Sequence, residues 1–189
     1  MRVVRCSKAV LFVSLLSLST LAVSEDEVPL GAKDVPPAEA KEAKTNTQFL
    51  LGNVLKKTEE LIEKFGNFSP YGAALFRDGS IRYVWYAKPG EMVKEPVKSL
   101  PVIRRALQTQ ALSGKIVGSA VVYKYMSPEE NLPQLNVELE YQTGLAMAFA
   151  TEMTVDADRQ VVWGGNVQAN IDPRVFVVSG ESEVARSEP

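Results

Sequence analysis

The chain contains no histidine, and its only cysteine is Cys6. Without imidazole there can be no Ser-His-Asp triad, no Cys-His dyad and no histidine-ligated metal ion. A single cysteine cannot close a disulfide within the chain, so the folded domain must be stabilised by its apolar core. After the first 24 residues there is also no G-x-S-x-G, Walker-type or S-x-x-K motif. These absences favour a non-enzymatic protein that uses no cofactor and no metal.

Length and charge restrict the protein further. The chain has 189 residues, 46% of them hydrophobic, which suits one ordinary globular domain. Its 21 basic and 23 acidic residues give a net charge of −2, and no basic block occurs anywhere in the sequence. Nucleic acid is therefore not an expected partner, because binding to phosphates requires a concentration of Lys and Arg.

The first 24 residues have the form of a secretory signal peptide. Three basic residues precede an apolar stretch from Ala9 to Val23, and small residues at Ala22 and Ser24 predict cleavage after Ser24. The alternative is a retained membrane anchor, but this stretch is shorter than the roughly 20 residues of a spanning helix. We therefore expect an exported bacterial protein, periplasmic or secreted, with no stable membrane insertion after cleavage.

Composition divides the rest of the chain into three parts. Residues 25–45 are rich in Glu, Lys, Ala and Pro and are predicted to form a flexible linker, because they cannot bury enough apolar surface to offset their ordering. Residues 46–178 are predicted to form a single α+β domain. Residues 179–189 resemble the linker in composition and are predicted to be a disordered tail.

Hydrophobic periodicity predicts the elements of this domain. A helix is expected from Thr45, which begins a capping box with Gln48, to a stop at Gly66, and a second helix from Ser99 to Gly114. Asp78-Gly79 predicts a β-hairpin with a two-residue turn. Further strands are expected at 115–125, 134–142, 145–153 and 159–163. The predicted fold is α+β, in the order α-β-β-α-β-β-β, with two helices on one face of a mostly antiparallel sheet of about five strands.

Two segments carry a resemblance to known domains. The sequence Asn67-Phe68-Ser69-Pro70-Tyr71-Gly72 enters the predicted hairpin, and Val137-Glu138-Leu139-Glu140-Tyr141 forms a later strand with Gly144 beyond it. In this pattern, over about residues 65–163, the chain resembles small uncharacterised bacterial α+β domains, which imply no assigned activity. The export signal and the linker are additions to that pattern. The order of elements also looks like that of roadblock and profilin-like folds, which is an analogy of fold alone.

A two-residue turn at Thr143-Gly144 predicts the surface that meets a partner. It would bring Glu138 and Glu140 onto one sheet face with Met147 and Phe149, and Arg82 and Val84 of the hairpin would join them. An apolar patch rimmed by charge is typical of a protein-binding or homodimer surface. A turn of another length would exchange the two faces and bury Met147 and Phe149.

The leading hypothesis is an exported, non-enzymatic binding or interaction module that acts through an open sheet face. One alternative is a carboxylate-based hydrolase of cell-envelope material, with Glu138 or Glu140 close to Glu152, Asp156 or Asp158. Another is a small-ligand carrier whose pocket, between helix and sheet, is lined by Tyr83, Trp85 and Tyr141.

Overall fold

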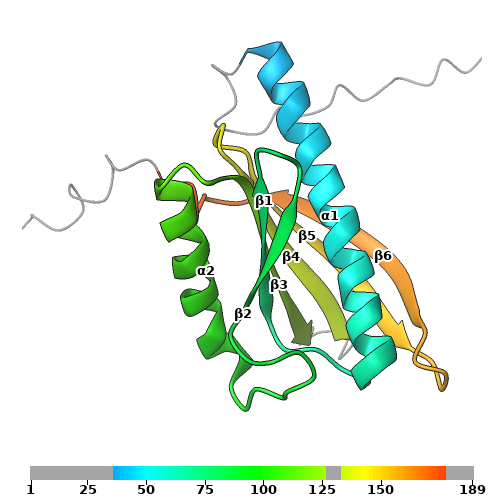
Figure 1. Ribbon diagram of the computed structural model, residues 1–189. Helices are drawn as coiled ribbons and strands as arrows, with labels where there is room; N and C mark the ends of the chain where they lie inside the picture. The colour runs from blue at the N-terminus through cyan, green and yellow to red at the C-terminus, as the bar shows by residue number, and fades with distance from the viewer. Residues whose placement is uncertain (1–35, 127–132, 178–189) are drawn as a thin grey trace, which may run out of the picture.

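The computed structural model describes residues 36–126 and 133–177. They form two helices and a six-stranded antiparallel sheet in the order β2-β1-β3-β4-β5-β6, which confirms the predicted α+β class (Figure 1). The elements are α1 (Pro37–Phe65), β1 (Tyr71–Phe76), β2 (Ile81–Trp85), α2 (Pro96–Leu112), β3 (Ile116–Met126), β4 (Pro133–Tyr141), β5 (Ala146–Val155) and β6 (Val161–Asn170). The predicted signal peptide and tail lie outside the described residues.

The helix α1 starts earlier than its sequence pattern suggested. It begins at Pro37, not at Thr45, so residues 37–45 of the predicted linker are helical. Proline is well suited to this position because the first helical N–H needs no partner within the helix. The Thr45 hydroxyl donates back to the Lys41 carbonyl and does not cap the helix. The predicted stop is confirmed, because Gly66 ends the helix with a φ of 75° and donates its N–H to the Ile62 carbonyl.

The two helices lie on opposite faces of the sheet, which corrects the predicted placement on one face. On β1, Tyr71, Ala73 and Leu75 pack into the core under α1, whereas Ala74 packs with Leu100, Ile103 and Leu107 of α2. Successive residues of a strand point to opposite faces, so the central strands are covered on both sides. Figure 1 shows the sheet flanked by α1, in cyan, and α2, in green.

Both predicted hairpins contain one more turn residue than expected. In the first, Phe76 pairs with Ser80, so the turn is Arg77-Asp78-Gly79 and Leu75 pairs with Ile81. Gly79 has a φ of 81°, as the last residue of a three-residue turn requires. The residues of the hairpin that face α1 are therefore Tyr71, Ala73 and Leu75 of β1 and Ile81, Tyr83 and Trp85 of β2. Ala74 and Phe76 face α2.

The second hairpin turns at Gln142-Thr143-Gly144. Tyr141 donates its N–H to the Leu145 carbonyl, Leu139 pairs with Met147 and Val137 pairs with Phe149. This shift of one residue exchanges the two faces of β5 relative to the predicted register. Phe149 is therefore buried under α1, and Met147 packs against the same core.

Glycine substitutions test the close approach of α2 to β1. A Cβ added at Gly72 would lie 2.8 Å from Cγ2 of Ile103 and 3.1 Å from Cδ1 of Leu107, whereas a Cβ at Gly52 on α1 meets nothing within 4 Å. We expect Gly72→Ala to lower the free energy of unfolding by about 1–3 kcal/mol through overpacking. Gly52→Ala should raise it by up to about 1 kcal/mol through helix propensity. Urea denaturation of both variants measures the contrast, and equal effects would contradict the packing described here.

The buried phenol of Tyr71 should make stability depend on alkaline pH. Burial raises the pKa of Tyr71 well above its ordinary value of 10.0, and its hydroxyl donates to the Val54 carbonyl at 2.8 Å. The unfolded chain loses this proton first, so the stabilisation is complete below pH 10.0 and falls as the pH rises above it. Tyr71→Phe should lower the free energy of unfolding by about 1 kcal/mol at neutral pH. Between neutral pH and about pH 11, this variant should lose less stability than the unchanged protein does. Urea unfolding of both proteins at the two pH values measures the difference.

Candidate functional site

The two carboxylates of β4 singled out in the sequence are buried. Only 5% of Glu138 and 2% of Glu140 is exposed. They point to the face of β4 away from the α1 core, where α2 and the segment 171–177 meet them. A buried carboxylate must be hydrogen-bonded or paired, so the partners of these two groups decide what they do.

Glu138 is held by two arginines that lie far from it in the sequence. Arg104 of α2 donates to both of its oxygens, at 2.9 and 2.7 Å, and Arg174 donates to Oε1 at 2.9 Å. The Tyr123 hydroxyl donates to the same oxygen at 3.3 Å. Burial and the Glu138 charge raise the pKa of Tyr123, so this phenol stays protonated and can donate. Glu138 therefore connects α2, β4 and the segment 171–177.

Glu140 binds only main-chain donors among its described partners. Its carboxylate accepts from the N–H groups of Arg174 at 2.9 Å, Val175 at 2.8 Å and Phe176 at 3.0 Å. Charge-assisted bonds of this kind are stronger than bonds between neutral groups. Glu140 therefore anchors the segment after β6 against the sheet, and Val175 joins the core formed with α2.

The predicted partner-contact group is not brought together. Glu138 and Glu140 lie on the α2 side, whereas Met147 and Phe149 lie on the α1 side because of the second turn. Val84 packs against the α2 core. Arg82 is exposed and lies over the Phe76 ring, 4.5 Å from its centroid. On the α2 side of the sheet, the β5–β6 end is half-buried or exposed. Its residues there are Ala148, Ala150, Val162 and Val167.

The acids proposed for a hydrolase are also dispersed. Glu152 pairs with Gln134, four residues along β4 from Glu138, which corresponds to about 13 Å. Asp156 and Asp158 are exposed in the β5–β6 turn, where Oδ1 of Asp156 accepts the N–H groups of Asp158 and Gln160. These acids share no cleft with Glu138 or Glu140, and the Asp156 carboxylate serves to form the turn.

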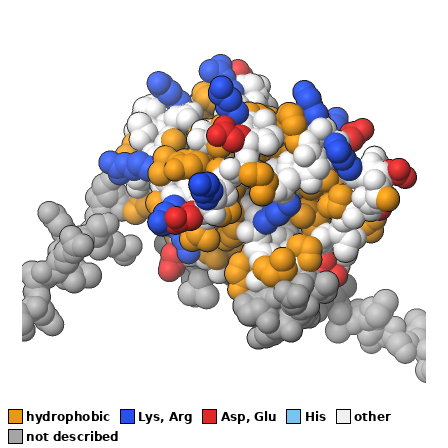
Figure 2. All heavy atoms as spheres, turned by 90° about the horizontal axis from the view of Figure 1, so that it is seen from below, with side chains coloured by type: hydrophobic (Ala, Val, Ile, Leu, Met, Phe, Trp, Pro, Cys, Tyr) orange, Lys and Arg blue, Asp and Glu red, His pale blue; other side chains and the backbone are white. Residues whose placement is uncertain are grey.

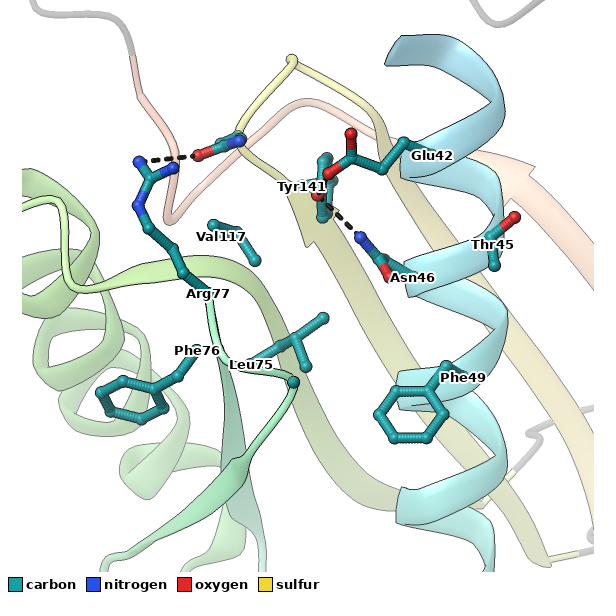
Figure 3. Close-up of a pocket in the computed structure, with 11 residues that line it drawn as sticks. Glu42, Thr45, Asn46, Phe49, Leu75, Phe76, Arg77, Val117 and Tyr141 are labelled. Atoms are coloured by element: carbon teal, nitrogen blue, oxygen red, sulfur yellow. Dashed lines mark hydrogen bonds between the residues drawn. The ribbon is translucent and has the colours of Figure 1, made fainter. Parts of the chain in front are cut away.

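A pocket of about 420 Å³ lies between the first half of α1 and the β1–β2 turn (Figure 3). Its walls come from four places in the sequence: Glu42, Thr45, Asn46 and Phe49 of α1, Leu75, Phe76, Arg77 and Gly79 of the first hairpin, Val117 of β3, and Tyr141 with Gln142 at the end of β4. Of the three aromatic residues predicted to line a pocket, only Tyr141 lines this one. Tyr83 and Trp85 instead form an aromatic cluster with Tyr71.

Tyr141 organises the α1 side of this pocket. Its hydroxyl donates to Oε1 of Glu42 at 2.8 Å and accepts from Nδ2 of Asn46 at 2.8 Å, as the close-up of Figure 3 shows for these side chains. Burial, followed by the hydrogen bond to Glu42, raises the pKa of Tyr141. The phenol therefore remains a donor at neutral pH and fixes both helix side chains in place.

The strand β6 forms one edge of the sheet and extends well beyond its predicted end at Trp163. Its first residues are tied to α1, because Trp163 donates to Oε1 of Glu59 at 2.7 Å and Arg159, in the turn before it, reaches the last carbonyls of the helix. From Gly164 to Asn170 every residue is exposed. The ten residues Val161–Asn170 include no charged side chain and no proline. Edge strands in soluble proteins are normally protected by such residues or by being short.

The hydrogen-bond pattern shows which backbone groups of β6 point outward. Ile171 donates its N–H to the Ala146 carbonyl, so the Ala146–Ile171 pair is hydrogen-bonded, and so are the pairs at Ala169 and Val167. The alternate residues Asn166, Gln168 and Asn170 direct their N–H and C=O groups away from β5. No described residue pairs with these groups.

Comparisons with known proteins provide no relatives for this arrangement: no family model, no curated protein and no solved structure matches the chain. Within residues 36–126 and 133–177, no three acidic or cysteine side chains gather closely enough to hold a metal ion. The helices described there are all too short or too polar to cross a membrane. The candidate sites are therefore the pocket and the β6 edge, both defined by geometry alone.

Neutralising Glu140 tests its role as an anchor. Glu140→Gln keeps the size of the side chain but replaces a charged acceptor of three N–H groups by an amide, so we expect a loss of about 2–3 kcal/mol in unfolding free energy. The amides of Arg174, Val175 and Phe176 should exchange with deuterium at least about tenfold faster. Glu152→Gln, on the next strand, is the control. Unchanged exchange in Glu140→Gln would show that the anchor is not needed.

Proposed function

We propose that the chain is an exported, non-enzymatic interaction module that associates through the exposed edge of β6. The observation that carries this proposal is an edge strand of ten residues without a charge or a proline, exposed throughout from Gly164 to Asn170. Export is inferred from the signal-like first 24 residues. The mode of association is strand addition, in which main-chain hydrogen bonds of the incoming strand extend the sheet.

The opposite edge of the same sheet provides a comparison within the molecule. The strand β2 has only five residues and carries Arg82 as its second residue, so it has the length and the charge that discourage pairing. The strand β6 is twice as long and has neither protection. The difference between the two edges favours β6 as the surface used for association.

The partner that best fits this edge is a second copy of the chain. In an antiparallel pair centred on Gln168, the amide side chains of Asn166 and the partner's Asn170 would lie opposite each other. On the other face, Val167 would lie opposite the partner's Ala169. The strand is thus complementary to itself, and having no charge it incurs no like-charge repulsion across the twofold axis.

The size of this contact predicts a modest affinity. The outward groups of Asn166, Gln168 and Asn170 would form about six backbone hydrogen bonds with a second copy. Val167, which is 69% exposed, would lose part of its contact with water. An interface of this size falls among the small, reversible ones, so we expect a dimer with a dissociation constant in the micromolar range.

Neither catalysis nor nucleic-acid binding is part of the proposal. The buried carboxylates of β4 are engaged by arginine side chains and backbone N–H groups. The chain has a net charge of −2. On the face shown in Figure 2, basic and acidic side chains are interspersed among hydrophobic ones, with no field of a single sign. Such a surface suits contact with protein better than contact with phosphate.

Two substitutions at one position test the edge. Gln168→Pro removes the outward N–H and places the proline ring where the incoming strand would bind, without removing a bond to β5. Gln168→Ala keeps this N–H. We expect sedimentation velocity over a range of concentrations to show a reversible dimer for the unchanged protein and for Gln168→Ala. Gln168→Pro should dimerise at least about tenfold more weakly.

Circular dichroism and thermal unfolding of both variants confirm that the domain is intact. A protein that stays monomeric at high micromolar concentration contradicts the proposal. So does a dimer that Gln168→Pro leaves unchanged, because it would have to form through another surface.

A further inference from the structure

We infer that the pocket between α1 and the β1–β2 turn binds a small zwitterion, with an ammonium group at one end and a carboxylate at the other, of the size of a dipeptide. This site does not involve the β6 edge and goes beyond the proposed function. It depends on three features of the pocket: acceptors on one wall, donors on the other, and an apolar floor between them (Figure 3).

The α1 wall presents hydrogen-bond acceptors. One oxygen of Glu42 accepts from the Tyr141 hydroxyl, and the second oxygen has no described partner. Asn46 uses its Nδ2 as a donor to the same hydroxyl, which leaves its carbonyl oxygen to accept. A carboxylate and a carbonyl oxygen, both positioned by Tyr141, are suited to bind an ammonium group.

The opposite wall presents donors. Arg77, in the β1–β2 turn, makes one described hydrogen bond, a contact of 3.4 Å to Oε1 of Gln142. No acidic side chain of the described residues forms an ion pair with this guanidinium. Its remaining N–H groups can bind a carboxylate in the bidentate geometry that arginine favours. Figure 3 shows Arg77 and Glu42 on opposite sides of the pocket, with Tyr141 between them.

The floor is apolar and partly open to solvent. Leu75, Val117 and the ring of Phe49 line it, and Phe49 is 49% exposed although it is a large aromatic residue. A volume of about 420 Å³ lies in the usual range for small-ligand sites. A ligand that spans charged walls and covers such a floor has separated charges and an apolar body, as a dipeptide with one aliphatic side chain does.

The experiment compares alanyl-leucine with its two blocked forms. When the free dipeptide is titrated into the isotope-labelled protein, NMR spectra should show chemical-shift changes at the backbone amides of Asn46, Gly79 and Gln142. N-acetyl-alanyl-leucine lacks the ammonium group and alanyl-leucine amide lacks the carboxylate, so each should bind at least about tenfold more weakly. This comparison needs no variant and cannot be confused with unfolding.

Variants assign each charge to its wall. Arg77→Gln should weaken binding of the free dipeptide about tenfold, while its affinity for alanyl-leucine amide should equal that of the unchanged protein. Glu42→Gln should also weaken binding of the free dipeptide about tenfold, while its affinity for N-acetyl-alanyl-leucine should equal that of the unchanged protein. Glu39→Gln and Arg105→Gln, exposed and outside the pocket, are the charge controls. Absent shifts at the pocket amides, or equal binding of free and blocked dipeptides, would overturn the inference.

Discussion

The register of β4 against β5 decides which side chains of β5 enter the core under α1. A three-residue turn, Gln142-Thr143-Gly144, places Met147 and Phe149 of β5 on the side of α1, opposite Leu139 and Val137 of β4. The same register places Ala148 and Ala146 beside Glu138 and Glu140, on the side of α2 and the segment 171–177. Because alternate residues of a strand face opposite ways, a two-residue turn would have exchanged these two sets of β5 residues and turned Phe149 away from α1. The composition of the core under α1 therefore depends on this register.

The two faces of the central strands are stabilised by different chemistry. Under α1 the contacts are apolar and aromatic, and the few polar atoms are satisfied locally, as when Tyr71 bonds to Thr58 and Val54. Under α2 a smaller apolar core adjoins two buried carboxylates. The ion pairs of Glu138 with Arg104 and Arg174 fix geometry more than they add net stability, because desolvation offsets much of the attraction. Their role here is to hold α2 and the segment after β6 on the sheet.

The two candidate binding surfaces lie in different parts of the molecule and use different elements. The pocket is built from the first half of α1 and the turns next to it, so its charged walls are carried by a helix and a hairpin. The β6 edge is held to α1 at its beginning by Trp163 and is exposed from Gly164 to Asn170. Rigid elements therefore support both surfaces, and either could be occupied without displacing the other.

Sequence patterns alone determined the element types, several of their ends and the α+β class. The three-and-four spacing of apolar residues, the alternation along the strands and the glycines at 66, 79, 114 and 144 are local signals, and all four glycines have a positive φ in the structure. Only the tertiary structure decided the turn lengths and therefore the faces of the sheet. A shift of one residue in the pairing of two strands leaves the local sequence patterns unchanged. It nevertheless exchanges the side chains that face α1 with those that face α2.

The same reason explains what the sequence did not reveal about the sites. Arg104 and Arg174 reach Glu138 from distant parts of the chain, and Glu42 and Arg77 meet only across the pocket, so no spacing along the sequence marks them. The second half of β6 had a weak local signal, an uncharged alternating run, but its exposure depends on its place at the edge of the sheet. Hydrophobic periodicity determines whether a segment forms a helix or a strand. The elements packed around that segment determine which of its groups can contact a ligand or a partner.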